Sequence, residues 1–170
     1  IRRFFGDLLA YAEVDLRAQP GICELTGALV IDRARGLGFA GLSERCDEVG
    51  AAAMHAAFGL RATLLFDLAP GEYHTNVVLS VLAGRAAVLA PSGFADPAVV
   101  AGIAALYGPA VVMLDASQKA SFAGNCIALS EHDCWMSAAG ASSLTKGQRE
   151  QLAAAGFALR VVELDEIEKA

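Results

Sequence analysis

Apolar residues in this chain of 170 residues form short runs that recur in a fixed order. Three predicted helices end at Gly59, Gly108 and Gly156, so the helix ends lie 49 and 48 residues apart. Each glycine is followed by a short apolar strand that ends in an aspartate, over residues 62–67, 110–115 and 158–165. A fixed period of this size is typical of a chain built from one repeated supersecondary unit.

The order of elements within the period predicts a ββαβ unit. In the first unit, strands at 27–32 and 37–42 precede a helix that starts at Ser43, Cys46 or Asp47. In the second unit, strands at 76–81 and 86–90 precede a helix whose start is marked by Asp96 and Pro97. In the third unit, strands at 126–129 and 134–136 precede a helix with a predicted capping box at 145–148.

The fold class expected from this repeat is α/β, with repeated ββαβ units in a single, incomplete domain. Residues 22–71, 72–120 and 121–168 are the full units. Residues 1–21 are interpreted as the end of a preceding unit, because 1–12 has helical spacing and 14–16 resembles its closing strand. We expect a piece of a longer closed array, with the rest supplied in cis or in trans. An open stack of ββαβ layers, complete as given, is the alternative.

Composition excludes several classes of partner. The net charge of −6 argues against nucleic acid, which usually needs a basic face. No apolar run reaches the roughly 20 residues that span a bilayer. The first residues do not resemble a signal peptide, because Asp7 and Glu13 interrupt the apolar stretch. We therefore expect a cytoplasmic protein without membrane contact.

Four polar residues stand out from the apolar pattern at related places in the repeat. Glu24, His74 and Asn125 each lie where the first strand of a unit begins, and Arg45 follows the second strand of the first unit. If the units pack around an axis, Glu24, His74 and Asn125 face one central pocket with Arg45 at its rim. Histidine can serve as acid and base, and the arginine fork suits a carboxylate. A lone histidine here would more simply be a surface residue, but the set favours a pocket.

The four cysteines are best interpreted as small packing residues. Cys23, Cys46, Cys126 and Cys134 show no metal-binding spacing, so neither a metal site nor a disulfide framework is expected. Cys23 is next to Glu24, and neighbouring side chains on a strand point to opposite faces. If Glu24 faces the pocket, Cys23 therefore faces away from it.

Four short motifs carry a family resemblance that covers nearly the whole chain. They are residues 24–27 (Glu-Leu-Thr-Gly), 41–45 (Gly-Leu-Ser-Glu-Arg), 73–77 (Tyr-His-Thr-Asn-Val) and 122–125 (Phe-Ala-Gly-Asn). With them the chain resembles the guanidino-group-modifying enzymes, namely arginine deiminases, dimethylarginine hydrolases and amidinotransferases. These enzymes share a five-bladed α/β propeller, the pentein fold. Within the group, the chain is most similar to amidinotransferase-like hydrolases linked to citrulline utilisation.

The resemblance assigns roles to these residues. His74 corresponds to the general acid and base, and Glu24 to the group that binds the guanidinium or ureido nitrogens and partners His74. Arg45 corresponds to the residue that holds the substrate carboxylate. Asn76 replaces an aspartate of the deiminases and, with Asn125, is assigned to substrate binding. The family's nucleophilic cysteine comes after a segment like 163–170 and is not present in this chain.

The function implied by the resemblance is hydrolysis of a guanidino or ureido C–N bond in arginine- or citrulline-like amino acids by covalent cysteine catalysis. No metal or organic cofactor is expected, and the chain alone is expected to be inactive. An amidinotransferase is one alternative. A non-catalytic binding module is another, as in the ribosomal-subunit anti-association factor with the pentein fold. The sequence leaves the oligomeric state and the choice between hydrolase and transferase open.

Overall fold

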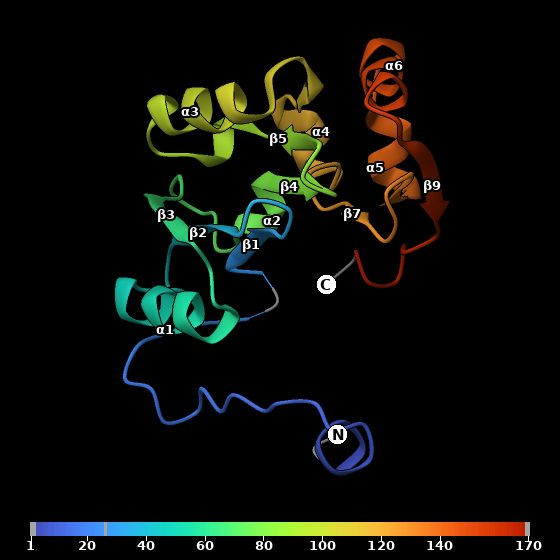
Figure 1. Cartoon of the computed structure of the whole chain (residues 1–170). Helices are drawn as coiled ribbons and strands as arrows, with labels where there is room; N and C mark the ends of the chain where they lie inside the picture. Colours follow the sequence, from blue (N-terminus) through green and yellow to red (C-terminus); the bar gives the residue numbers. More distant parts are fainter. Residues whose placement is uncertain (1–2, 26, 169–170) are drawn as a thin grey trace.

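The structure, a computed structural model, describes residues 3–25 and 27–168. These residues contain three sheets of three strands, each formed by one continuous stretch of chain (Figure 1). The first sheet consists of β1 (Leu29–Asp32), β2 (Leu37–Leu42) and β3 (Ala62–Asp67). The second consists of β4 (Leu79–Leu82), β5 (Ala86–Leu89) and β6 (Val111–Met113). The third consists of β7 (Ile127–Ala128), β8 (Asp133–Ser137) and β9 (Ala158–Val162).

Each sheet has the topology expected of a ββαβ unit. The first two strands are antiparallel, with Leu29 opposite Ala40, and the third strand joins the second in parallel. A parallel pair needs a crossover connection, which helices α1 (Glu48–Phe58), α3 (Pro97–Tyr107) and α6 (Lys146–Ala154) supply at the outside (Figure 1). The first strands of successive units touch, β1 beside β4 and β4 beside β7. The predicted α/β class with repeated ββαβ units is confirmed.

Local sequence signals account for where these helices begin and end. The Asp47 side chain accepts a hydrogen bond from the Gly50 amide at 2.7 Å, so it is Asp47 that starts α1. Thr145 and Gln148 form the predicted capping box of α6. Gly59 ends α1 in the left-handed region with φ of 59°, where a side chain would be strained, and the other two period glycines also have positive φ.

The predicted strand 76–81 is wrong over its first half. Residues Thr75–Val78 form a helical turn, α2, and β4 begins only at Leu79. The buried Thr75 hydroxyl donates to the Ala28 carbonyl at 2.6 Å and accepts from the Gly41 amide at 2.8 Å. These contacts fix the backbone of the turn against the first unit. They override the strand preference of the two valines that follow.

Other element boundaries differ from the prediction for local reasons. The predicted strand 110–115 is shortened to β6, preceded by η3 (Gly108–Ala110), because Asp115 caps a short helix, α4 (Ala116–Ala120), with Gln118. Strand 126–129 narrows to the two residues of β7, and 158–165 ends with β9. Two further elements were also not predicted, η2 (Pro91–Gly93) and α5 (Ala138–Ser143).

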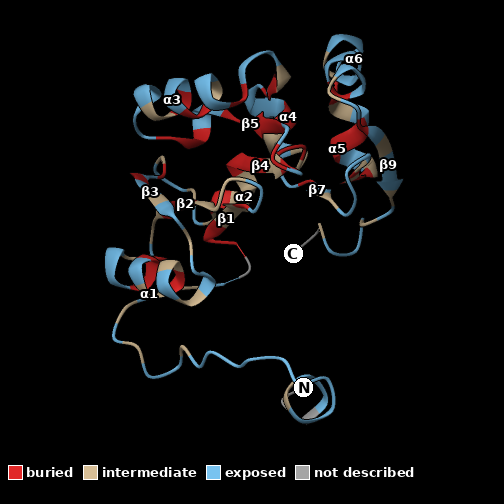
Figure 2. Ribbon diagram, viewed as in Figure 1, coloured by how far each residue is buried: buried red, intermediate tan, exposed pale blue. Residues whose placement is uncertain are grey.

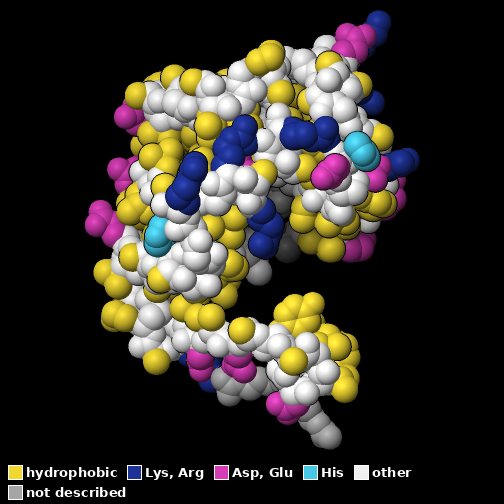
Figure 3. All heavy atoms as spheres, viewed as in Figure 1, with side chains coloured by type: hydrophobic (Ala, Val, Ile, Leu, Met, Phe, Trp, Pro, Cys, Tyr) yellow, Lys and Arg dark blue, Asp and Glu magenta, His cyan; other side chains and the backbone are white. Residues whose placement is uncertain are grey.

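The N-terminal segment differs most from its prediction. Of the predicted helix 1–12, a π-helical turn, η1 (Arg3–Leu8), forms, while Ile1 lies outside the described residues. Residues 14–16 are not a strand, since none of the described strands lies beside them to complete a ladder. The segment leads away from the sheets and carries hydrophobic side chains on its surface (Figures 1 and 3). Those exposed are Phe4, Phe5, Leu8, Leu9, Tyr11 and Val14.

The core is concentrated in the second unit, where every residue of β5 is buried (Figure 2). A smaller cluster packs between the first sheet and α1. We call it the α1 cluster, and its buried members are Ala28, Leu29, Ala40, Cys46, Ala51 and Met54. Among the described residues, none of the helices has the length and apolar character of a membrane span.

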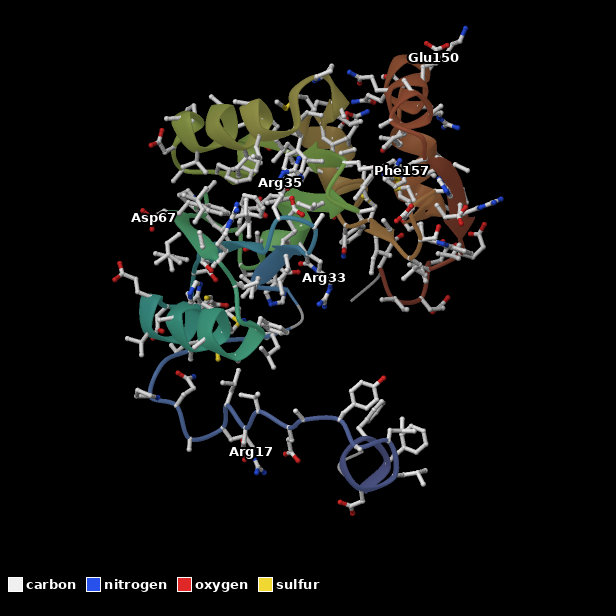
Figure 4. All side chains as sticks on the ribbon, viewed as in Figure 1. Arg17, Arg33, Arg35, Asp67, Glu150 and Phe157 are labelled. Atoms are coloured by element: carbon white, nitrogen blue, oxygen red, sulfur yellow. The ribbon has the colours of Figure 1, made fainter. Side chains whose placement is uncertain are left out.

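A repeated contact joins neighbouring units. The Arg35 guanidinium, in the turn between β1 and β2, lies 5.1 Å from the ring centre of Tyr107 in the second unit. The Arg85 guanidinium, in the turn between β4 and β5, lies 4.7 Å from the ring centre of Phe157 in the third unit (Arg35 and Phe157 are labelled in Figure 4). At the first of these contacts, the fully buried Asp32 accepts hydrogen bonds from Tyr107 at 2.8 Å and from Arg35 at 2.9 Å.

Candidate active site

Two short segments of the first unit pair with each other just outside its sheet. Cys23 and Cys46 form an isolated antiparallel bridge, and the Glu24 amide donates to the Arg45 carbonyl at 3.0 Å. Ser43 and Cys46 exchange backbone hydrogen bonds of 3.0 and 3.2 Å, which closes the turn that carries Arg45. Residues that face each other across an antiparallel pair project on the same side. The backbone therefore brings Glu24 and Arg45 together.

Three of the residues predicted for the site form one cluster of charged and polar side chains. Glu24 Oε2 lies 3.2 Å from Arg45 Nη1, and Glu24 Oε1 lies 3.0 Å from His74 Nε2. The exposed fraction of the side chain falls from 51% for Arg45 through 39% for Glu24 to 16% for His74. The carboxylate therefore joins a solvent-facing arginine to a largely buried imidazole.

His74 owes its position to the segment around it. It is the N-cap residue of α2 with an extended backbone. A Cβ atom at Gly27 would lie 2.5 Å from the imidazole Cγ, so only glycine lets the chain pass this close to the ring. The Asn76 amide donates to the Gly27 carbonyl at 3.0 Å and holds the two segments together. The Tyr73 ring packs against the imidazole with 4.7 Å between ring centres.

Two buried polar atoms of the site have no hydrogen-bond partner among the described residues. They are Nε2 of His74 and Oδ1 of Asn76. The Nε2 atom is at ion-pair distance from Glu24, but the approach does not meet hydrogen-bond geometry. Buried polar atoms are usually paired, and unpaired ones call for a specific explanation. Both atoms belong to residues that the sequence assigns to catalysis or substrate binding.

The Arg45 guanidinium keeps binding capacity despite its two acidic neighbours. Its Nη1 donates to Glu24 and its Nε donates to Glu44 at 3.3 Å. The Glu24 and Glu44 carboxylates raise the pKa of Arg45, so it stays charged. Its Nη2 makes no hydrogen bond within the described part of the chain, which leaves two N–H groups for a ligand.

The structure does not bring Asn125 into this cluster. The side chain is exposed, and none of the hydrogen bonds among the described residues connects it to Glu24, Arg45 or His74. It lines a separate cavity of about 290 Å³ in the third unit, together with residues of β7, β8 and the segment after β9. The described residues contain no group of three or more His, Cys, Asp or Glu side chains placed to hold a metal ion.

Ser43 was missed by the sequence analysis although it connects the two halves of the site. Its hydroxyl donates to the Tyr73 carbonyl at 2.8 Å and accepts from the Arg45 amide at 3.1 Å. It thereby ties the turn with Arg45 to the segment with His74. The serine is part of the Gly-Leu-Ser-Glu-Arg motif, but the residue to which it binds lies 30 positions away.

The sequence model of the eukaryotic N,N-dimethylarginine dimethylhydrolase family matches residues 7–170. The chain belongs to this family. Membership places it among the guanidino-group-modifying enzymes of the pentein superfamily, as the four motifs predict. No protein with a curated description matches the chain.

Solved structures similar to this dimethylhydrolase-family chain share its fold. The N-terminal domain of ArgZ, an arginine dihydrolase from the ornithine-ammonia cycle in cyanobacteria, has a TM-score of 0.78 and 19% identity, with coverage of 98% of this chain and 59% of that chain. Unliganded AgrE has the same score and identity, over 99% of this chain and 24% of its own. A dimethylarginine dimethylaminohydrolase adduct with S-methyl-L-thiocitrulline has a TM-score of 0.58 and 17% identity, over 86% and 54%. The chain thus spans less than two thirds of each relative.

Proposed function

We propose that this chain carries the acid/base and carboxylate-binding part of a C–N hydrolase. Its substrate is the guanidino or ureido group of an arginine- or citrulline-like amino acid. The observation that carries the proposal is the single carboxylate of Glu24, which contacts both Arg45 and His74 within 3.2 Å. A substrate with a cationic end group and a negative α-carboxylate can be bound by an acid and an arginine that belong to one site.

Each residue of the cluster has a chemical role in this proposal. Glu24 binds the guanidinium or ureido nitrogens and orients His74, which donates and accepts protons at Nε2. Arg45 holds the α-carboxylate through its Nη2 group, which has no partner among the described residues. Asn76 offers its buried Oδ1 to a substrate N–H group. We also propose Asn125 as a substrate contact, which requires the substrate to reach the separate cavity that Asn125 lines.

The reaction proposed is covalent catalysis by a cysteine thiolate. The thiolate adds to the central carbon, His74 protonates the departing amine, and the C–N bond breaks. His74 then takes a proton from water, whose oxygen adds to the same carbon, and the C–S bond breaks to release the product. An amidinotransferase would use the same site with an amine in place of that water.

The cysteines of this chain are poor candidates for that nucleophile. Burial raises the pKa of the Cys46 thiol to about 11. Cys126 donates a hydrogen bond to Cys134, which raises the pKa of Cys126 and lowers that of Cys134, but both are buried in the third unit. Cys23 packs against the α1 cluster and, as the neighbour of Glu24 on an extended segment, projects away from the site, so it has no access to the substrate. A reactive thiol needs both a low pKa and access, so we propose that the nucleophile comes from a segment outside this chain.

The remaining partners follow from the same proposal. The rest of the propeller would be supplied in cis or in trans, and the substrate is a free amino acid. The four free cysteines support a cytoplasmic location, where thiols stay reduced.

Ammonia and ureido-product assays on arginine, citrulline and methylated arginines test the function. We expect no turnover by the 170-residue chain and turnover by a version extended at its C-terminus. His74→Ala should abolish that activity, whereas His55→Ala, in the last turn of α1 and hydrogen-bonded to Thr63, should not. Arg45→Lys should raise KM more than it lowers kcat, and Arg33→Lys in an exposed turn serves as its control.

Several results would count against parts of this proposal. Turnover by the short chain that is lost in Cys23→Ser would place the nucleophile inside this chain. Activity only when an amine acceptor is added would indicate the transferase. An extended chain that binds arginine without turning it over would indicate the non-catalytic binding module.

A further inference from the structure

Cys23 and Cys46 face each other directly across the short antiparallel bridge next to the site. The residues on either side of the two cysteines exchange the flanking backbone hydrogen bonds, both of 3.0 Å, so the cysteines are a non-hydrogen-bonded pair. The Cα atoms of such a pair lie about 4.5 Å apart, inside the range of roughly 4.4–6.8 Å found for disulfides. The backbone therefore already has a separation that a disulfide can bridge.

The two thiols also share one side of the pair. Cys46 belongs to the buried α1 cluster, and Cys23 packs against the same cluster. Two backbone hydrogen bonds between Cys46 and Ser43 hold the Cys46 backbone in place. The sulfur atoms therefore start on the same side of the pair, where rotation about the side-chain bonds brings them toward each other.

The two cysteines differ in their access to solvent, and this difference sets the order of reaction. Cys23 is half-buried and can be reached from solvent, whereas Cys46 is fully buried. Burial, and then the nearby Asp47 and Cys23, raise the pKa of Cys46 to about 11. The Gln19 side-chain amide donates to Cys23 Sγ at 3.2 Å, which holds the more exposed of the two sulfur atoms in place. Cys23 is therefore the thiol that meets an oxidant first.

We propose that Cys23 and Cys46 are a redox-sensitive thiol pair that a peroxide converts into a reversible intramolecular disulfide. The Cys23 thiolate attacks one peroxide oxygen, the O–O bond breaks, and Cys23 becomes a sulfenic acid while hydroxide leaves. The Cys46 sulfur then attacks Cys23 Sγ, the S–O bond breaks, and the second hydroxide leaves. Together the two thiols lose two electrons and two protons, and the peroxide is reduced to two molecules of water.

The cross-link would fix the two backbones that carry Glu24 and Arg45. Each cysteine directly adjoins one of these residues, so the disulfide would hold the separation that the hydrogen bond from Glu24 to Arg45 now sets. Closing the loop between positions 23 and 46 should raise the melting temperature by about 5–10 °C. A small reducing thiol should reverse the change.

Peptide mapping after oxidation tests the pair without reference to the proposed activity. The reduced chain is treated with hydrogen peroxide, free thiols are blocked, and the protein is digested with trypsin under non-reducing conditions. Trypsin places Cys23 in peptide 18–33, Cys46 in 46–61, and both Cys126 and Cys134 in 120–146. We expect 18–33 joined to 46–61 with the loss of two hydrogens, and a higher melting temperature that dithiothreitol reverses.

Three variants make the outcome decisive. Cys23→Ser should abolish the joined peptide and the melting-temperature shift, while Cys126→Ser, which removes a thiol sealed in the third unit, should leave both unchanged. Cys46→Ala should leave Cys23 as a trapped sulfenic acid that a dimedone probe labels. The proposal is overturned if Cys23 is over-oxidised while Cys46 stays reduced, or if Cys23 links only to a second chain.

Discussion

Replacing Tyr107 with phenylalanine isolates one hydrogen bond between the first and second units. The Tyr107 hydroxyl donates to Oδ2 of Asp32 at 2.8 Å, and Asp32 is fully buried. The ring itself remains in Tyr107→Phe, so no cavity opens and the contact with Arg35 is kept. A buried hydrogen bond to a charged acceptor contributes about 1.5–3 kcal/mol. We therefore expect the free energy of unfolding to fall by about 2 kcal/mol, which for a chain of this size lowers the melting temperature by about 4–8 °C.

The stability lost in Tyr107→Phe should depend on pH, because the hydrogen bond stabilises the ionised form of Asp32. Burial by itself raises the pKa of Asp32, but the hydrogen bonds from Tyr107 and Arg35 outweigh it and hold the pKa below the ordinary value. The ionised Asp32 therefore stabilises the fold above the unfolded-state pKa, and this contribution is lost as the pH falls through the lower folded-state pKa. The difference between the wild type and Tyr107→Phe should be full near neutral pH and shrink in acid.

Urea unfolding between pH 3 and pH 7, followed by circular dichroism and by the fluorescence of the single Trp135, measures both quantities. Tyr73→Phe is the matched control, because Tyr73 is exposed and its hydroxyl makes no hydrogen bond within the described residues. A cost below about 0.5 kcal/mol, the usual scatter of surface substitutions, would refute the argument. So would a cost that does not change between neutral and acid pH.

Substitutions at three further positions test other parts of the structure. Gly27→Ala places a methyl group 2.5 Å from the His74 ring, and it should shift the His74 imidazole signals in NMR spectra and lower stability by about 1–3 kcal/mol. Thr145→Ala removes the cap of α6 and should lower the free energy of unfolding by about 1 kcal/mol in urea titrations. Arg85→Met removes the cation over Phe157 and should cost about 0.5–1 kcal/mol, whereas Arg85→Lys should restore part of it.

Sequence patterns predicted those parts of the fold that depend on local signals. A few neighbouring residues determine the helix starts at Asp96 and Thr145 and the glycines that follow the helices. The strand predicted from residue 76 failed because the hydroxyl of Thr75 binds backbone groups more than thirty residues away. No local pattern contains that contact, and the following valines favour a strand in its absence.

The residues of the candidate site also fall into those that the sequence placed correctly and one that it did not. Equivalent positions in the repeat predicted that Glu24 and His74 would meet, and the ion-pair distance agrees. The same argument placed Asn125 with them, but Asn125, just before the first strand of the third unit, lines a different cavity. Repeat equivalence specifies where a residue lies in its own unit. It does not specify how each unit is rotated relative to the previous one. That rotation decides which units have the starts of their first strands at the same pocket.

The repeated contact of a turn arginine with an aromatic ring gives the array a direction. Each contact joins two unlike surfaces, a turn of one unit and the helix end of the next, so the interfaces are heterologous and run head to tail. Each unit therefore depends on its immediate neighbours, and damage at one interface acts mainly on the two units that it joins. Weakening the contact at Arg35 should loosen the interface between the first and second units and leave the interface between the second and third units intact.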